Sequence, residues 1–279
     1  MRRRILLVLA ATATAILWST TLASGAGPSP GVSRGGSGLT SGDVRYVALP
    51  AGAATLVEAI DRNGRVLHRR TVKGAWGLPL VAYDNTVEGL VQGGRALLLA
   101  RQIYTASGNL RTPTSFKLLD AQTLKVTRDV RIRGTFTFDA ASPDGRYVYL
   151  IEYFSAEDPT LYRVRAYDLR EGKLLAKIVA DRRSWATGMQ GMPISRTWKD
   201  GWAYTLYGGN ARPFIHALNA RGLEAVCINL PWQSSPQRIF DFRLRTDRDG
   251  HLVVRGPNGR ALAVVDRQTF KILSAVENP

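Results

Sequence analysis

The stretch SPDGRYVYLIE (142–152) places a turn signal directly before a run of strand-forming residues. Glycine supplies the positive φ angle that tight hairpin turns require, and an aspartate beside it can cap the turn with its side chain. The tyrosine, valine and isoleucine residues that follow favour an extended strand. The stretch therefore predicts a β-hairpin, and the question is whether the pattern returns elsewhere in the chain.

The same pattern of turn and strand occurs five times at a nearly constant spacing. Its turn glycines stand 52, 51, 56 and 49 residues apart and are Gly42, Gly94, Gly145, Gly201 and Gly250. A second marker follows in phase, an alternating strand that ends in Asp or Asn before another short turn and strand. The residues at this second turn are Asp61, Asp120, Asp168, Asn219 and Asp266. Two independent markers with one period indicate a repeated structural unit.

A further strand precedes the glycine turn in four of the five units, over residues 78–84, 135–140, 192–198 and 239–245. Four short antiparallel strands in about 50 residues are the signature of a propeller blade. We therefore predict an all-β chain, a β-propeller with five blades of mostly four-stranded antiparallel sheets over residues 43–279. The first unit lacks an evident innermost strand and the chain ends on an outer one, so we expect imperfect closure of the ring.

Two segments carry a resemblance to a known family. PDGRYVYL (143–150) and DLREGKLL (168–175) resemble the WD40-like, YVTN-type β-propeller repeats of exported bacterial proteins. The second segment also resembles the blades of quinoprotein propellers, but the tryptophan that those blades carry after this turn is missing, and we expect no cofactor. The resemblance covers residues 43–279 and implies a fold rather than an activity, because propellers serve as scaffolds, lectins, lactonases and glycosidases alike.

The N-terminus is typical of a targeting segment. Three arginines precede an apolar stretch (5–18), and small residues follow it. This order predicts a signal peptide over residues 1–25, cleaved after Gly25 or Ala26, and leaves an uncleaved N-terminal membrane anchor as the alternative. Residues 26–42 are rich in Gly, Ser and Pro and predict a flexible linker. We expect a secreted or extracytoplasmic domain, in contact with a membrane only through its N-terminal segment if that segment stays uncleaved.

The net charge of the chain indicates which partners it can attract, and its single cysteine is a separate feature. The formal net charge of +16 would attract a polyanion at the cell envelope, while a glycan or a protein partner stays open. The chain has 31 arginines and 7 lysines without a dense run or a nucleic-acid-binding motif, so we expect no nucleic-acid partner. Cys227 lies in an apolar strand and predicts a buried, inert thiol.

The candidate ligand site follows from the loops. The turns on one face of the propeller are short, whereas those on the other face are long and varied, and varied loops on a rigid scaffold usually carry binding. Three crossings between blades contain Trp76, Trp185 and Trp232, which either form a stacking platform or plug the gaps between blades. The other candidate ligand-binding residues on this long-loop face are Arg101, Tyr153, Tyr207, Asn210 and Arg212.

Two functions remain open from the sequence. The first is an exported β-propeller that acts as a binding or scaffold module at the cell envelope, with its ligand face on the long-loop side. The alternative is a hydrolase or lactonase-like enzyme that uses carboxylates in the channel, drawn from Asp84, Glu88 and Asp139. The chain lacks the nucleophile elbow, zinc, phosphate-loop and dinucleotide motifs. We therefore assign no catalytic residue, and the scattered histidines give no metal site.

Overall fold

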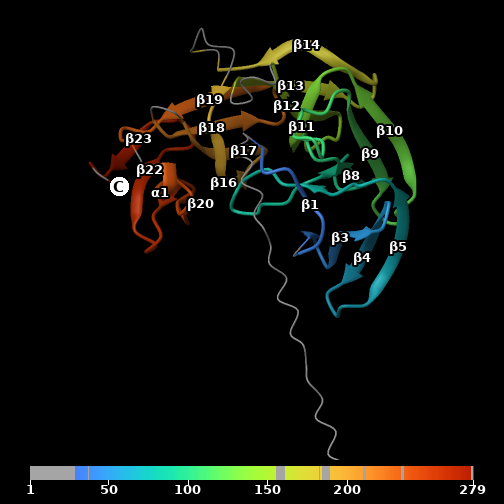
Figure 1. Ribbon diagram of the computed structural model, residues 1–279. Coiled ribbons are helices and arrows are strands. Elements are labelled where there is room, and N and C mark those ends of the chain that lie inside the picture. Colours follow the sequence, from blue (N-terminus) through green and yellow to red (C-terminus); the bar gives the residue numbers. More distant parts are fainter. Residues whose placement is uncertain are drawn as a thin grey trace, which may run out of the picture.

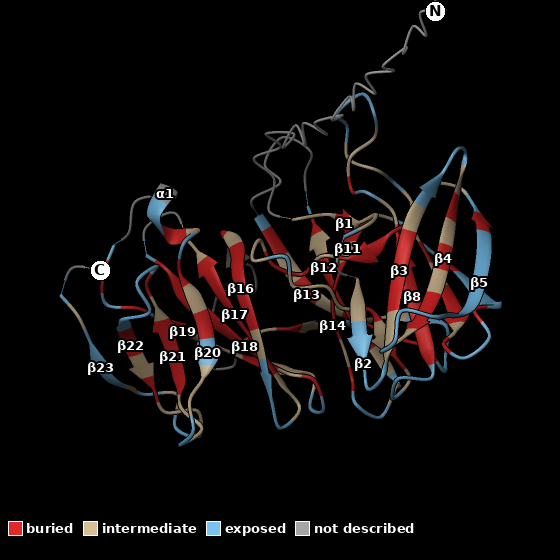
Figure 2. Ribbon diagram, turned by 90° about the horizontal axis from the view of Figure 1, so that it is seen from below, coloured by how far each residue is buried: buried red, intermediate tan, exposed pale blue. Residues whose placement is uncertain are grey.

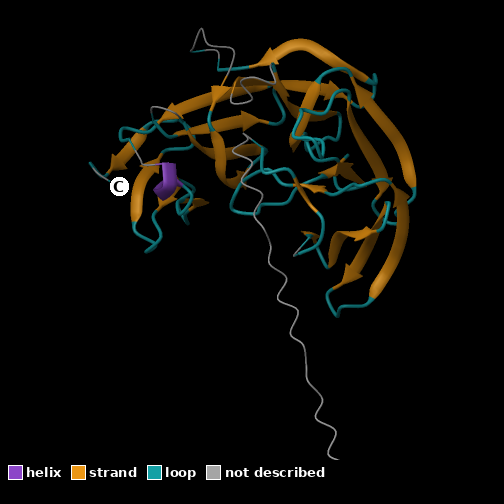
Figure 3. Ribbon diagram, viewed as in Figure 1, coloured by secondary structure: helices purple, strands orange, loops and turns teal. Residues whose placement is uncertain are grey.

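The computed structural model describes residues 29–36, 38–154, 161–181, 183, 189–209, 212–233, 236–277 and 279. Almost all regular structure in this part of the chain is β-strand, and its one helix is the four-residue α1 (Pro236–Ile239), as Figure 3 shows. None of the helical structure described is long and apolar enough to cross a membrane. The signal peptide predicted over residues 1–25 lies outside the described residues.

Five four-stranded antiparallel units follow one another along the chain, and each is one blade. Blade 1 consists of β2 (Leu39–Ser41), β3 (Val44–Ala51), β4 (Ala54–Asp61) and β5 (Val66–Lys73). Blade 2 consists of β7 (Leu90–Val91), β8 (Ala96–Ala100), β9 (Thr114–Asp120) and β10 (Val126–Ile132). Blade 3 consists of β11 (Thr135–Ala141), β12 (Tyr147–Tyr153), β13 (Leu161–Asp168) and β14 (Lys173–Val179), with β15 (Met189–Gln190) also paired to β13. Blade 4 consists of β16 (Met192–Lys199), β17 (Trp202–Gly208), β18 (Phe214–Asn219) and β19 (Glu224–Asn229). Blade 5 consists of β20 (Arg243–Thr246), β21 (Leu252–Arg255), β22 (Ala261–Val265) and β23 (Ile272–Ala275).

The turns take the conformations that the two sequence markers predict. All five turn glycines have positive φ angles, between 58° and 86°. At the second marker, the carboxylate of Asp168 accepts the backbone N–H groups of Arg170 at 2.8 Å and Glu171 at 3.0 Å. The predicted blade repeat is therefore confirmed, because the glycines adopt the positive φ angles of tight turns and Asp168 caps its turn with its carboxylate.

The core lies between neighbouring blades. Leu98 and Leu118 of blade 2 share a buried cluster with Val148 and Leu150 of blade 3, and comparable clusters lie at the other blade interfaces. Figure 2 shows the middle strands of the blades mostly buried and the outermost strand β5 mostly exposed. Burial of both faces explains why second strands such as β8 and β21 are apolar almost throughout. Third strands such as β4 and β9 alternate between buried and partly exposed residues, and the outer strand β5 carries charge.

The blades follow an open arc and not a closed ring. In Figure 1 the blades run in order from blue to red, and the first and last blades stay apart. In the described residues, no strand of blade 5 pairs with a strand of blade 1. The sequence predicted imperfect closure because blade 1 lacked an evident innermost strand. The structure gives that place to β2, so the arc is open although blade 1 is complete.

The segment predicted as a linker contains two strands. β2 is the innermost strand of blade 1, where Leu39 pairs with Tyr46. β1 (Val32–Ser33) pairs with β6 (Leu78–Pro79), and Val32 is buried. The prediction of a flexible linker over 26–42 is therefore wrong for these strands. Gly38 shows the reason, because a Cβ atom there would lie 2.2 Å from the carbonyl oxygen of Tyr46, so the glycine permits close packing.

We expect that a chain beginning at Asp43 is less stable than one beginning at Ser29. The deletion removes the buried side chain of Val32 and the pairing of β2 with β3, and should lower the free energy of unfolding by about 3 kcal/mol. Urea unfolding of the two chains measures the difference. Equal midpoints would mean that both strands are dispensable and that the segment behaves as a tether.

Candidate functional site

Residues 80–87, here called the axial hairpin, lie between β6 and β7 in the sequence, before blade 2 begins. The sequence predicts an innermost strand of blade 2 over 78–84, but the structure gives that place to β7, which pairs with β8. The prediction for 78–84 is thus corrected. A bridge between Leu80 and Val87 closes the hairpin. Innermost strands of a propeller line its axis, and the hairpin lies against two of them, since Leu80 and Val81 line one small cavity with Phe138 of β11 and Pro193 of β16.

Backbone hydrogen bonds hold the axial hairpin against blade 4. The N–H groups of Tyr83 and Asp84 donate to the carbonyl oxygens of Pro193 at 2.9 Å and Ile194 at 3.0 Å, both on β16. The turn itself is local, because the Asp84 carboxylate accepts the backbone N–H of Thr86 at 3.1 Å and its hydroxyl at 2.5 Å. The sequence DNT thus forms the turn, and β16 anchors it.

A buried arginine joins three blades beneath this hairpin. Arg196 of β16 has a side chain that is 1% exposed, and its Nη2 donates to the carbonyl oxygen of Asp139 at 2.8 Å and to the carboxylate of the same residue. Its Nε lies 3.7 Å from Oε1 of Glu88, and its backbone N–H donates to Asp84 at 3.3 Å. We call Asp84, Glu88, Asp139 and Arg196 the axial network.

The ionisation of the axial network reflects its burial. Burial opposes the charge of Arg196, yet Asp139 and Glu88 raise its pKa, so the guanidinium stays protonated. Burial raises the pKa of Glu88, and the neighbouring charges of Asp139 and Asp84 add to this, while Arg196 and a hydrogen bond from Trp198 work against it. Glu88 therefore takes up a proton at a higher pH than an ordinary glutamate does.

A cleft opens beside the axial network on the side of the glycine turns. Its volume is about 310 Å³, and the innermost segments of four successive blades surround it. Its lining residues are Leu39, Glu88, Gly89, Leu90, Gly93, Gly94, Ala141, Ser142, Pro143 and Trp198. We call this space the axial cleft.

Trp198 and Glu88 are the two chemically distinctive groups of the axial cleft. The Trp198 residue is 37% exposed although it lies at the inner strand of a blade. Its indole Nε1–H donates to Oε1 of Glu88 at 2.7 Å. A hydrogen-bonded indole in a concave site presents a fixed apolar face, and such tryptophans are frequent anchors for ligands.

The three carboxylates named for a hydrolase do come together, but around Arg196. Asp139 is 3% exposed, and the cavity that it lines measures only about 10 Å³, roughly the space of one water molecule. Asp84 does not line that cavity. Two catalytic carboxylates need room for a sugar or an ester between them. The described residues give Asp84 and Asp139 no such room.

Four candidates on the long-loop face are buried. Trp76 is 6% exposed, and its Nε1–H donates to the carbonyl oxygen of Lys73 at 2.8 Å. Trp232 lies in the apolar core between blades 4 and 5. Tyr153 and Tyr207 lie in the core between blades 3 and 4. The platform hypothesis is therefore wrong for both tryptophans, which plug gaps between blades as the alternative predicts. The rings of the two tyrosines are buried and are not accessible to a ligand.

The other long-loop candidates are not brought together. Arg101 lies over the ring of Trp76, 5.5 Å from its centroid, and Arg212 is exposed. Trp185 and Asn210 lie outside the described residues.

Blade 5 also has a cleft of about 160 Å³ lined by Arg238 and Arg260, at the open end of the arc. The roles of Arg101 and Arg212 in ligand binding stay predictions.

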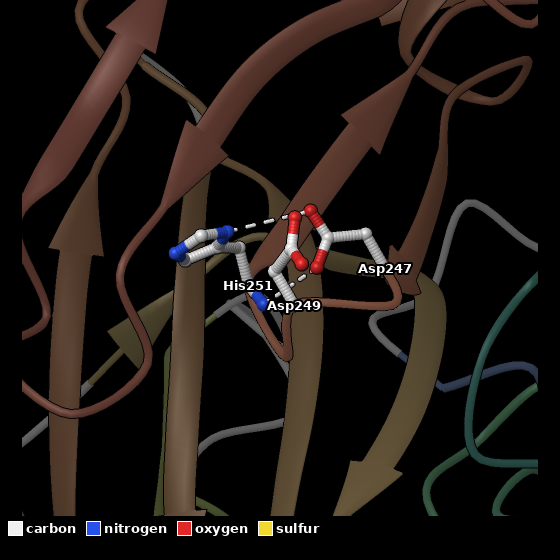
Figure 4. A group of neighbouring side chains, drawn as sticks. All are labelled: Asp247, Asp249 and His251. Atoms are coloured by element: carbon white, nitrogen blue, oxygen red, sulfur yellow. Dashed lines mark hydrogen bonds and ion pairs between the residues drawn. The ribbon is translucent and has the colours of Figure 1, made fainter.

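One cluster of two aspartates and a histidine has the composition of a metal site. Asp247, Asp249 and His251 lie around the glycine turn of blade 5, with potential ligand atoms within 4.8 Å of one another (Figure 4). The Asp247 carboxylate already accepts the backbone N–H of His251 at 2.8 Å and lies 3.4 Å from its Nδ1. Asp247 thus caps the glycine turn with its carboxylate, in the way that Asp168 caps a turn of blade 3, and this role explains the cluster.

Sequence reasoning named Glu88 but missed Trp198 and Leu39. Trp198 lies near the end of a strand, where the surrounding sequence does not distinguish an exposed tryptophan from a buried one. Its one signal is the adjacent glycine turn, which places it at the rim of a blade. Leu39 was assigned to the linker.

The comparisons with known proteins concern the fold. No protein-family model matches the sequence, and no curated protein matches it. Among solved structures, the dihydro-heme d1 dehydrogenase NirN in complex with DHE is similar with a TM-score of 0.50, at 14% identity over 89% of this chain and 48% of that one. A europium-containing methanol dehydrogenase has a TM-score of 0.48, at 16% identity over 89% and 51%. The β-propeller domain of the Trilobed protease from Pyrococcus furiosus has a TM-score of 0.44, at 9% identity over 85% and 67%.

These likenesses extend over most of this chain but over only part of the others. The chain spans about half the length of NirN and of the methanol dehydrogenase. At such low identity a likeness shows architecture and not activity. Five consecutive four-stranded antiparallel blades identify the fold as a β-propeller.

Proposed function

We propose that this chain is an exported β-propeller binding module of the cell envelope, and that its ligand enters the axial cleft. The observation that carries the proposal is Trp198, which is 37% exposed, hydrogen-bonded to Glu88 and set in a cleft of about 310 Å³. A concave, mostly apolar site with a few polar groups is the usual form of a ligand site. The buried interior, in contrast, offers no comparable space beside Asp139.

Export and the partner class belong to the same proposal. The arginines and the apolar stretch at the N-terminus support a signal peptide, and the net charge of +16 supports attraction to anionic envelope polymers. A mature N-terminus at residue 26 or 27, measured by mass spectrometry of the exported protein, would check the leader. The basic surface can attract such polymers while a separate, specific ligand occupies the cleft.

A screen of glycans, polyanions and short peptides with two matched variants tests the cleft. Trp198→Ala removes the exposed indole of the cleft, and Phe154→Ala removes an aromatic ring that is 49% exposed and follows β12 on the long-loop side. We expect Trp198→Ala to weaken the ligand that the screen identifies by about tenfold or more, and Phe154→Ala to leave its affinity within about twofold. The opposite ranking would place the ligand on the long-loop face and refute the proposed site.

A further inference from the structure

The axial cleft has an unusual charge for so basic a protein. Its lining contains one charged side chain, the carboxylate of Glu88, and no lysine or arginine. Leu39, Leu90, Ala141 and Pro143 make most of the remaining wall apolar. A ligand group that enters the cleft therefore meets apolar surface and one negative charge.

The charge behind that wall is also negative. One guanidinium, that of Arg196, faces the carboxylates of Glu88 and Asp139, and the backbone N–H of the same residue bonds to the carboxylate of Asp84. One positive charge therefore lies among three carboxylates, which gives a formal charge of −2 when all three are ionised. The surplus lies at the axis, where β16, the axial hairpin and β11 meet. Carboxylates in such surroundings are stabilised by a further cation, because the protein supplies fewer positive charges than negative ones.

The geometry of Glu88 leaves room for that cation. Its Oε1 accepts the indole N–H of Trp198 and faces Nε of Arg196. The hydrogen bond from Trp198 and the ion pair with Arg196 both involve Oε1 and leave Oε2 aside, and the side chain is 15% exposed. An ammonium or guanidinium group in the cleft can donate to Oε2 and lie near the indole, which attracts cations through its ring face.

We infer that the axial cleft binds a cationic group on an apolar stem, as in a lysine or arginine side chain of a peptide or protein partner. The inference rests on the proposed function and adds the chemical class of the ligand. The apolar wall accommodates the methylene stem, and the carboxylate and the indole take the head group. An anion would meet Glu88 without a cation in the lining, and a neutral group would leave the surplus charge unchanged.

Isothermal titration of the full chain tests the inference with three capped tripeptides, Gly-Lys-Gly, Gly-norleucine-Gly and Gly-acetyllysine-Gly. We expect the lysine peptide to bind at least about tenfold more tightly than the two uncharged peptides. Glu88→Gln keeps an acceptor for the indole of Trp198 and removes the charge, so it should abolish this preference. Glu171→Gln, an exposed carboxylate at the aspartate turn of blade 3, makes the same charge change outside the cleft and should preserve it.

The pH dependence offers a second readout. Glu88 faces Asp84 and Asp139, which raise its pKa, and Arg196 and Trp198, which lower it, while burial raises it most. Binding of the lysine peptide should weaken as the pH falls through this raised pKa, because the protonated carboxyl no longer attracts a cation. In Glu88→Gln the affinity should be nearly constant over the same range.

The outcomes separate the inference from the proposed function. Equal binding of the charged and uncharged peptides, no effect of Glu88→Gln, or no binding of the lysine peptide up to about 10 mM each overturns the cationic ligand. If another ligand from the screen still depends on Trp198, the proposed function survives that failure. n-Butylammonium serves as the probe for a free amine, and binding equal to that of the lysine peptide would mean that the head group alone is recognised.

Discussion

Replacement of Arg196 by methionine is expected to lower the free energy of unfolding by about 3–5 kcal/mol, the largest loss from any single side chain in the axial network. The guanidinium is buried and faces Asp139 and Glu88, while the backbone N–H of the same residue bonds to Asp84. Its removal leaves several carboxylates in a poorly solvated place without a counter-charge. Methionine matches much of the volume, so the effect reports charge more than packing.

The measurement is urea unfolding at neutral pH, with Arg170→Met as the control. Arg170 is exposed on a short turn, and its loss should change stability by no more than about 0.5 kcal/mol. The destabilisation by Arg196→Met should shrink at acidic pH, because protonation discharges the orphaned carboxylates. A small, pH-independent effect would show that water replaces the guanidinium and that the network does not join the blades.

Replacement of Gly145 by alanine is expected to cost at least about 3 kcal/mol, more than the conformational strain of a left-handed residue explains. Gly145 has φ = 74°, and a Cβ atom at this position would lie 2.2 Å from the Cα atom of Gln92. The obstacle is backbone of the neighbouring blade, so a rotamer change cannot relieve it. The glycine turns of blades 2 and 3 would have to move apart.

Gly250→Ala is the matched control for this prediction. Gly250 occupies the equivalent turn of blade 5 with φ = 86°, but a Cβ atom there meets nothing within 4 Å. The control should therefore lose only the strain of positive φ, about 1–2 kcal/mol. Equal losses at the two positions would mean that the contact between the turns relaxes at no cost, and that φ alone governs both.

The blade repeat was open to prediction because its determinants are local. The glycine and aspartate turns act within a few residues of themselves, and alternation or continuous apolarity reports how far each strand is buried. PDGRYVYL forms the turn and strand that its composition predicts, and Asp168 caps its turn as expected.

The interpretation of the first and innermost segments failed for a physical reason. A glycine-rich stretch has the composition of a linker, yet at Gly38 the glycine lets β2 lie against blade 1. Residues 78–84 have the composition of an inner strand, yet part of this segment bonds to β16. Local propensity cannot distinguish these cases, because the deciding partner lies far away in the sequence.

By itself, the sequence determined the number of blades, the turn types and the apolar strands, because each depends on neighbours within one repeat. The tertiary structure alone decided which side chains meet at the axis. Arg196 and Asp84 are 112 residues apart, and Arg196 and Asp139 are 57 apart, so their contact depends on how whole blades are placed around the arc. The same placement buries Trp76 and Trp232 and exposes Trp198, since burial is decided by the neighbouring blade and not by the residue type.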